Sequence, residues 1–285
     1  MKYRCLYVVS VLVLCLGAAV SLRADTFAYA AGQIGTTRSS AFGILDLNTG
    51  AFNQIATENV FFPDLAIAPN GTLYAITEPF GAGPAEFATI NPSTGAITNI
   101  AVETVGLNTM AFSSNGTLYA DNYATSGPFS LYVINPANGA VSFITNLSGA
   151  LSNSANQIRF LGSTAYTTSY TTPSNLYTID LSTGTGTLIG STGLNANNGL
   201  GAVVNGQFID IASTGSGEQI FSINPVTGAA TPGASVNTFY VFAAIPVPEP
   251  ASVTLFACAG ALLAGLTMRR RRAISSRLSS EHRIK

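Results

Sequence analysis

The sequence predicts an all-β protein, a β-propeller of five four-stranded blades closed by a C-terminal strand, and three observations support this. A five-residue turn that starts with Asp or Asn and ends with Gly occurs five times, at steps of 44 or 45 residues. β-forming segments flank each copy, and one such segment is left over after the last repeat. A constant period of this length with four short strands per unit is typical of propeller blades.

The repeated turn has the chemistry of a hairpin loop. The side chain of its first residue can accept a bond from the backbone two residues on, Pro in three copies fixes φ, and the final Gly accepts positive φ. Apolar β-formers stand on both sides, except that Gly233 breaks the pattern after the fifth copy, so each turn joins two antiparallel strands. The copies are Asp46–Gly50, Asn91–Gly95, Asn135–Gly139, Asp180–Gly184 and Asn224–Gly228.

A second hairpin lies upstream in each full unit. Asn70-Gly71 and Asn115-Gly116 each precede β-formers, which is a strong hairpin signal, and the fourth and fifth units have weaker versions at Ser163-Thr164 and Asn205-Gly206. Each unit therefore consists of two hairpins joined by a variable loop, which makes four antiparallel strands.

The first unit lacks its first strand, because it opens at Phe27–Ala30. The spare segment Val236–Phe242 supplies that missing inner strand, which closes the ring and removes exposed edges. The alternatives are a less regular ring with a sixth blade and an open β-solenoid. An open stack would leave the spare strand without a role.

Residues 1–24 have the pattern of a secretory signal peptide. Lys2 and Arg4 precede the apolar segment Leu6–Val20, and cleavage is expected after Ala24. The alternative is an N-terminal membrane anchor, for which the apolar run is short against the ~20 residues of a span. The domain expected at residues 25–244 contains none of the three cysteines, so it has no disulfide framework.

The composition of the domain excludes several functions. Eleven acidic residues stand against Arg38 and Arg159 between Thr26 and Pro250, which disfavours nucleic-acid binding. The sole histidine is His282, and no Lys occurs between residues 3 and 284. A Ser-His-Asp site, a His-ligated Zn²⁺ and a Lys nucleophile are therefore excluded from the domain. We predict a protein that is not an enzyme, with a carboxylate pair as the one remaining catalytic chemistry.

Polar residues recur at or just before the predicted inner strands, which should surround one mouth of the central channel. A ring of amide oxygens and one carboxylate could hold Ca²⁺, the one cofactor considered. The alternative is that these side chains satisfy backbone groups where loops enter strands. Such a site would suggest a second function class, a Ca²⁺-dependent lactonase-like propeller enzyme. This class is disfavoured because only one of the five residues is a carboxylate. The residues are Asp64, Asn108, Asn156, Asn198 and Asn237.

The loops between the second and third strands of each unit should crown that same mouth. Their aromatic residues Phe80, Tyr123, Phe129 and Tyr170 stand among Gly, Pro, Ser and Thr, which would suit a carbohydrate or a protein surface. Ordinary solvated loops are the alternative. The loops are Ala31–Ala41, Thr77–Glu86, Asp121–Ser130, Thr168–Asn175 and Ser213–Gln219.

The C-terminal region has three parts. A Pro-rich spacer at 245–250 cannot continue a sheet, and residues 251–268 carry no charge over a length that can span a membrane. Arg269, Arg270, Arg271 and Arg272 follow and begin a basic tail, 269–285, that should stay cytoplasmic.

This tail resembles the PEP-CTERM sorting signal, with Val247, Pro248, Glu249 and Pro250 as the recognition motif and the arginines as the retention signal. The resemblance implies export across the inner membrane of a Gram-negative bacterium, transient anchoring there, cutting by an exosortase, and delivery to the cell surface or an extracellular polysaccharide matrix. One departure is that the chain continues through Ala273–Lys285, whereas the family usually stops soon after its arginines. The expected function is therefore that of a sorted surface or matrix propeller with a binding or structural role, whose partners are the exosortase, extracellular polysaccharide or surface proteins.

Overall fold

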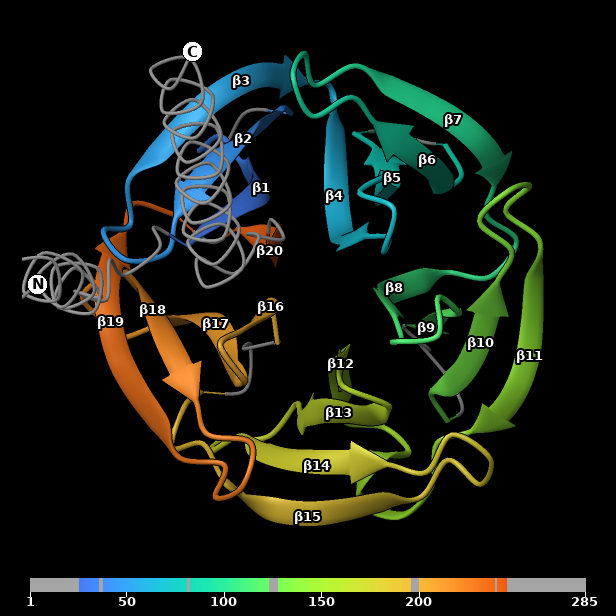
Figure 1. Cartoon of the computed structure of the whole chain (residues 1–285), viewed down its shortest axis with the longest axis vertical. Coiled ribbons are helices and arrows are strands. Elements are labelled where there is room, and N and C mark those ends of the chain that lie inside the picture. The colour runs from blue at the N-terminus through green and yellow to red at the C-terminus, as the bar shows by residue number, and fades with distance from the viewer. Residues whose placement is uncertain are drawn as a thin grey trace, which may run out of the picture. The chain divides into compact units, whose positions relative to one another are not determined.

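The computed structural model describes residues 26–35, 38–80, 83–122, 128–195, 200–238 and 240–244. These residues form five four-stranded antiparallel sheets around a central axis, as Figure 1 shows. The prediction of an all-β, five-bladed propeller is confirmed. The described strands belong to one compact unit, Asp25–Ile245.

Each blade is a run of antiparallel strands, with its first member innermost. Blade 1 consists of β20 (Val241–Ala244), β1 (Phe27–Gln33), β2 (Ser40–Asp46) and β3 (Phe52–Glu58). Blade 2 consists of β4 (Val60–Ile67), β5 (Leu73–Pro79), β6 (Glu86–Ile90) and β7 (Ile97–Val102). Blade 3 consists of β8 (Leu107–Phe112), β9 (Leu118–Asn122), β10 (Ser130–Ile134) and β11 (Val141–Asn146).

The last two blades follow the same order. Blade 4 consists of β12 (Ala155–Leu161), β13 (Thr164–Ser169), β14 (Asn175–Ile179) and β15 (Gly186–Ser191). Blade 5 consists of β16 (Ala202–Val204), β17 (Gln207–Ser213), β18 (Glu218–Ile223) and β19 (Ala230–Val236). A short 3₁₀ helix, η1 (Gly149–Leu151), links blades 3 and 4.

The ring closes through β20, which pairs with β1 so that Val241 lies opposite Ala31 and Ala244 opposite Ala28. A C-terminal closing strand was predicted correctly, but its bounds differ from Val236–Phe242. Val236 ends the outer strand β19, where it lies opposite Glu218. The chain passes from the outer strand β19, which ends at Val236, to the inner strand β20, which begins at Val241, and strand propensity alone does not mark that change.

The repeated turns have the predicted geometry. In the first copy the Asp46 carboxylate accepts a bond from the Asn48 backbone N–H at 2.8 Å. The Gly50 N–H donates to the Asp46 carbonyl at 2.8 Å, and the same backbone bond recurs in the other four copies. All five closing glycines have positive φ, so the local sequence suffices to form each hairpin.

The core lies between blades rather than at the centre of the ring. Tyr74 of blade 2, for example, stacks on Phe87 at 5.3 Å between ring centroids and also contacts Phe112 of blade 3. Aromatic pairs of this kind recur between neighbouring blades, as with Tyr119 and Phe160. Neighbouring sheets therefore pack against each other through their faces around the ring.

The predicted targeting segments lie outside the described residues. These are the signal peptide 1–24 with Ala24, the spacer 245–250 with its motif, the apolar segment 251–268 and the basic tail 269–285. Within the described part of the chain, no helix has the length and apolar character needed to cross a membrane.

Candidate functional site

The five inner strands line a central channel, and one position on them is unusual. A cavity of about 180 Å³ in the channel is bordered by Ala66, Ala111, Ala202 and Ala243 from blades 2, 3, 5 and 1, and by Arg159 from β12 of blade 4. Four small side chains leave room for one long one. Arg159 therefore extends into space that the other blades leave open.

Arg159 of blade 4 forms hydrogen bonds to residues of three other blades. Its Nη2 donates to Asp64 Oδ1 at 2.7 Å and its Nη1 donates to Asp64 Oδ2 at 2.9 Å, which joins blade 4 to blade 2 in a bidentate ion pair. Its Nε donates to the Gly201 carbonyl of blade 5 at 2.8 Å, and its Nη1 to the Met110 carbonyl of blade 3 at 3.3 Å. A planar guanidinium is suited to such fixed, multiple donation.

Asp64 is fully buried and its two oxygens accept further bonds. The Thr109 hydroxyl donates to Oδ2 at 2.6 Å, as does the Met110 backbone N–H at 2.9 Å, and the Leu65 N–H donates to Oδ1 at 2.9 Å. The charge pair is therefore satisfied within the protein, as a buried pair must be if its desolvation is to be offset.

Two further buried carboxyls lie near this pair, and their environments favour the protonated form. Burial raises the pKa of Asp121 well above its ordinary value, and the Asp64 charge raises it further against the opposing effects of Arg159 and a bond from Asn108. Burial likewise raises the pKa of Asp210, opposed by the Ile211 N–H and Arg159. Asp121 Oδ1 and Asp210 Oδ2 have no hydrogen-bond partner among the described residues.

The predicted channel-mouth residues occupy different places relative to the inner strands. Asn108 is the second residue of β8 and Asn156 the second of β12, whereas Asn237 precedes β20 and accepts a bond from the Tyr240 hydroxyl at 2.8 Å. Asn198 lies outside the described residues. The groups that surround Asp64 are Thr109 and Arg159 rather than this set of asparagines.

The arrangement around Asp64 does not fit a Ca²⁺ ion. Both carboxylate oxygens accept bonds from a guanidinium, whose positive charge would repel a cation at the same place. Across the described ranges, no group of three or more His, Cys, Asp and Glu residues is placed to hold a metal ion.

Sequence reasoning missed Arg159 as a central residue. A signal was present, because Ile158-Arg159-Phe160 places an arginine where the matching strands read Leu65-Ala66-Ile67 and Met110-Ala111-Phe112. A charge in a predicted inner strand requires a buried partner, and the acids of the domain include that partner.

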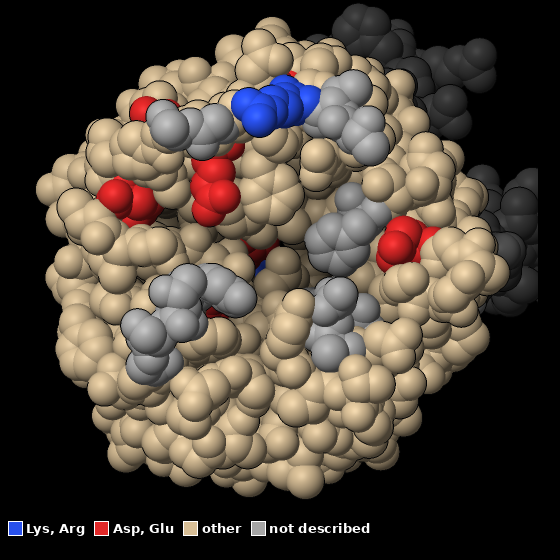
Figure 2. All heavy atoms as spheres, turned by 180° about the vertical axis from the view of Figure 1, so that it is seen from behind, with Lys and Arg blue, Asp and Glu red and all other residues tan. Residues whose placement is uncertain are grey.

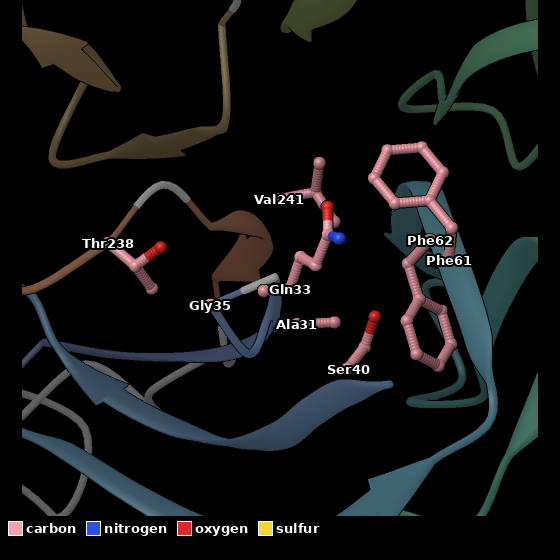
Figure 3. Close-up of a pocket in the computed structure, with 9 residues that line it drawn as sticks. Ala31, Gln33, Gly35, Ser40, Phe61, Phe62, Thr238 and Val241 are labelled. Carbon is pink, nitrogen blue, oxygen red and sulfur yellow. The ribbon is translucent and has the colours of Figure 1, made fainter. Parts of the chain in front are cut away.

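A second cavity, of about 260 Å³, lies between blades 1 and 2 beside the closing strand. Figure 3 shows Gln33 and Ser40 from the β1–β2 hairpin, Phe61 and Phe62 from β4, and the cavity that they border. None of the described residues that line it is charged. The lining residues are Ala31, Gly32, Gln33, Gly35, Ser40, Phe61, Phe62, Thr238 and Val241.

Figure 2 shows the face opposite to that of Figure 1. It is hollowed at the centre, where acidic and basic atoms lie at depth, and the surrounding surface carries few charges. Of the loop aromatics, Tyr170 is exposed and Phe80 is half-buried with its ring edge to face against Phe61 at 6.5 Å. Phe129 is instead buried in the core beside Leu131, and Tyr123 lies outside the described residues.

Several solved structures are similar to this chain. TolB from Acinetobacter baumannii is 18% identical with a TM-score of 0.50, and the match covers 74% of this chain and 53% of that one. A protein of unknown function from Bacteroides caccae is 12% identical with a TM-score of 0.42, and the match covers 76% of this chain and 77% of that one. A gluconolactonase from Xanthomonas campestris is 10% identical with a TM-score of 0.43, and the match covers 75% of this chain and 78% of that one. The chain thus spans about half the length of the TolB structure that it matches.

No curated protein matches the sequence. A family model described as a repeat of unknown function, DUF6923, matches residues 73–249, which is more than half of the chain. The matched region begins in blade 2 and includes the described strands from β5 to β20. On that match, the chain belongs to the DUF6923 repeat family.

Proposed function

We propose that this protein is exported, sorted by an exosortase, and delivered to the cell surface or extracellular matrix, where the propeller has a binding or structural role. The observation that carries the proposal is the three-part tail, in which the motif 247–250 precedes an uncharged segment and four arginines. The order of segments supports it further. The closing strand β20 ends at Ala244, so cutting near the motif would leave the ring intact.

A binding or structural role agrees with the chemistry of the channel. Arg159 and Asp64 are charged groups that many active sites would present to a substrate, but here they bond each other and the backbone of neighbouring blades. The Ca²⁺-dependent lactonase-like alternative relied on Asp64 as the carboxylate that binds the ion, and both oxygens of Asp64 accept bonds from Arg159. The surface loops of the rigid disc remain as the part that can meet a partner.

Sorting is tested by changing Pro248, Glu249 and Pro250 to alanine in the native host. We expect the uncut precursor to accumulate in the inner-membrane fraction, measured by immunoblot after fractionation. A matched control replaces Glu281, His282 and Arg283 by alanine, beyond the arginine cluster, and should sort normally. Normal release of the Pro-Glu-Pro variant would refute exosortase sorting.

The matrix role is tested in a host strain unable to make its extracellular polysaccharide. If the propeller binds that polymer, the protein should move from the matrix fraction to the culture medium. An unchanged distribution between the two fractions would argue against polysaccharide as the partner and favour surface proteins or self-association.

A further inference from the structure

We propose that the cavity between blades 1 and 2 binds one uncharged sugar ring of a polysaccharide. This rests on the proposed surface or matrix role and names the ligand class. The contact groups are Ser40, Gln33 and Thr238 on one side and Phe61 and Phe62 on the other.

The Ser40 hydroxyl is the first reason. Ser40 is 1% exposed and lines the cavity, and its Oγ has no hydrogen-bond partner among the described residues. In Figure 3 this oxygen is directed toward the space between Ala31 and Phe62. Burying a hydroxyl is unfavourable unless it forms a hydrogen bond, so a ligand hydroxyl that bonds to the Ser40 hydroxyl would be favoured.

The neighbouring polar groups match a hydroxyl-rich ligand. Gln33 lies directly opposite Ser40 in the β1–β2 ladder, so an amide and a hydroxyl border the same end of the cavity. Thr238 adds a second hydroxyl from the segment that leads into the closing strand. Amide and hydroxyl groups can each donate and accept, as the hydroxyls of a sugar require.

The opposite wall is aromatic. Phe61 is 38% exposed, and Phe80 packs on its ring edge to face. The pairing of β4 with β5 is irregular between Phe61 and Asp64, which interrupts the alternation of side chains and allows Phe61 and Phe62 both to border the cavity. An exposed ring face can stack against the apolar C–H face of a sugar.

The volume of the cavity and the charge of its lining residues restrict the class of ligand that it can bind. The volume of about 260 Å³ is slightly below the roughly 300–1,000 Å³ of pockets for drug-sized ligands, which suits a single ring. Since the described residues that line the cavity are all uncharged, none of them would offset the desolvation of an acidic sugar. The cavity in the channel differs, because the donors of its one polar side chain, Arg159, already have acceptors.

The test is calorimetric titration of the purified full chain in a detergent without a sugar headgroup. The probes are three neutral trisaccharides (cellotriose, maltotriose and mannotriose) and trigalacturonic acid as the acidic comparison. We expect at least one neutral trisaccharide to bind, and to bind at least about tenfold more tightly than the acid, since the cavity offers no cation. Binding of none, or of the acid alone, would overturn the proposal.

Two variants locate the binding. Phe61→Ala should weaken affinity about tenfold and Ser40→Ala about fivefold, from a lost stacking face and a lost hydrogen bond. Ser40→Ala should not lower the melting temperature, because its hydroxyl has no partner among the described residues. The matched controls are Phe143→Ala and Ser142→Ala, exposed residues of the outer strand β11.

Unchanged affinity in both Phe61→Ala and Ser40→Ala, or an equal loss in the controls, would refute this site. Surface delivery is measured in the same strains by fractionation and should match the wild type in all four variants. Normal delivery without sugar binding would reject the cavity and leave the sorting proposal standing, whereas failed delivery of the wild-type chain would reject the sorting proposal itself.

Discussion

Arg159 occupies a position at the centre of the ring that alanine occupies in the other four blades. Its bonds to Asp64, Met110 and Gly201 connect blade 4 to three other blades across 95 residues or fewer of sequence. A buried ion pair adds little net stability compared with apolar packing, but removal of one partner leaves the other charge buried and unpaired. Removal of one partner of the pair should therefore change the stability far more than removal of both.

Replacement of the arginine tests this directly. Arg159→Met leaves the Asp64 carboxylate without its cation, and we expect it to lower the free energy of unfolding by about 3–5 kcal/mol. The measurement is urea unfolding followed by circular dichroism.

The matched control for that prediction is Arg38→Met. Arg38 is exposed and donates one long bond of 3.5 Å to the Phe80 carbonyl, so its loss should change stability by less than about 0.5 kcal/mol. The double variant Asp64→Leu/Arg159→Met should recover much of the stability lost in Arg159→Met, because both charges leave together. Equal stability of wild type and Arg159→Met would show that the pair does not hold the ring.

A buried carboxyl makes stability depend on pH. Glu103 is 9% exposed, both its carboxyl oxygens lack partners among the described residues, and burial raises its pKa to about 7 from the ordinary 4.5. Between these values the folded state binds more protons than the unfolded state, so stability falls as pH rises from 4.5 and the loss is complete above 7. The raised pKa values of Asp121 and Asp210 act in the same direction.

We expect Glu103→Gln to flatten the melting temperature between pH 4.5 and 7 relative to the wild type, since the amide has no proton to lose. Thermal melts at several pH values measure this. Glu78→Gln changes an exposed carboxylate of the same blade and should leave the slope as it is in the wild type. A variant Glu103→Gln with the wild-type slope would contradict the assignment.

At the scale of the element, the repeated turn fulfils two requirements at once. Its closing glycine has positive φ, and a Cβ there would also overlap the outer strand of the preceding blade. At Gly95 the overlap is with Ala56 of β3, and at Gly139 it is with Ala101 of β7. The glycines of the inner hairpins, such as Gly71 and Gly116, share the positive φ but have open space around them.

The different surroundings of these glycines predict different losses of stability on replacement by alanine. Gly116→Ala should cost about 1–2 kcal/mol from the left-handed backbone alone. Gly95→Ala should cost about 1–3 kcal/mol more, because it also forces apart blades 1 and 2. Denaturant unfolding of both variants decides the matter, and equal losses would show that the turn does not act as a contact between blades.

For the whole molecule, closure depends on four residues of β20. Phe242 is buried, and its ring fills the space above Gly201 of blade 5, where a Cβ would overlap it. The same strand pairs with β1 of blade 1. The last strand of the ring thus contacts both the first and the last blade.

Removal of the Phe242 aromatic ring should lower stability strongly. Phe242→Ala is expected to lower the free energy of unfolding by about 3–5 kcal/mol, as for large buried aromatic side chains. The control Phe143→Ala removes an exposed ring of β11 and should stay within about 0.5 kcal/mol of the wild type. Urea midpoints measure both, and a native midpoint for Phe242→Ala would argue against closure through β20.

The sequence by itself determined the architecture, because the architecture repeats local chemistry. The Asp or Asn and the Gly of each turn, with Pro in three of the five copies, specify a hairpin through bonds within five residues, and five copies spaced 44 or 45 residues apart specify five blades. The spare strand after the fifth repeat required a ring, although local propensity did not mark where Val236 ends the rim strand and Val241 begins the inner one. The targeting segments stay predictions from the sequence.

Tertiary structure decided the candidate sites, because each depends on contacts between segments distant in the chain. The sequence singled out Asp64, but its partner Arg159 lies 95 residues away and no local rule pairs them. The neutral cavity joins the β1–β2 hairpin, β4 and the segment before β20. Burial of Phe129 likewise follows from packing, since the sequence does not distinguish an aromatic residue in a loop from one in the core. Only the closed ring brings these groups together, and its geometry is set by how blades pack rather than by what each strand prefers.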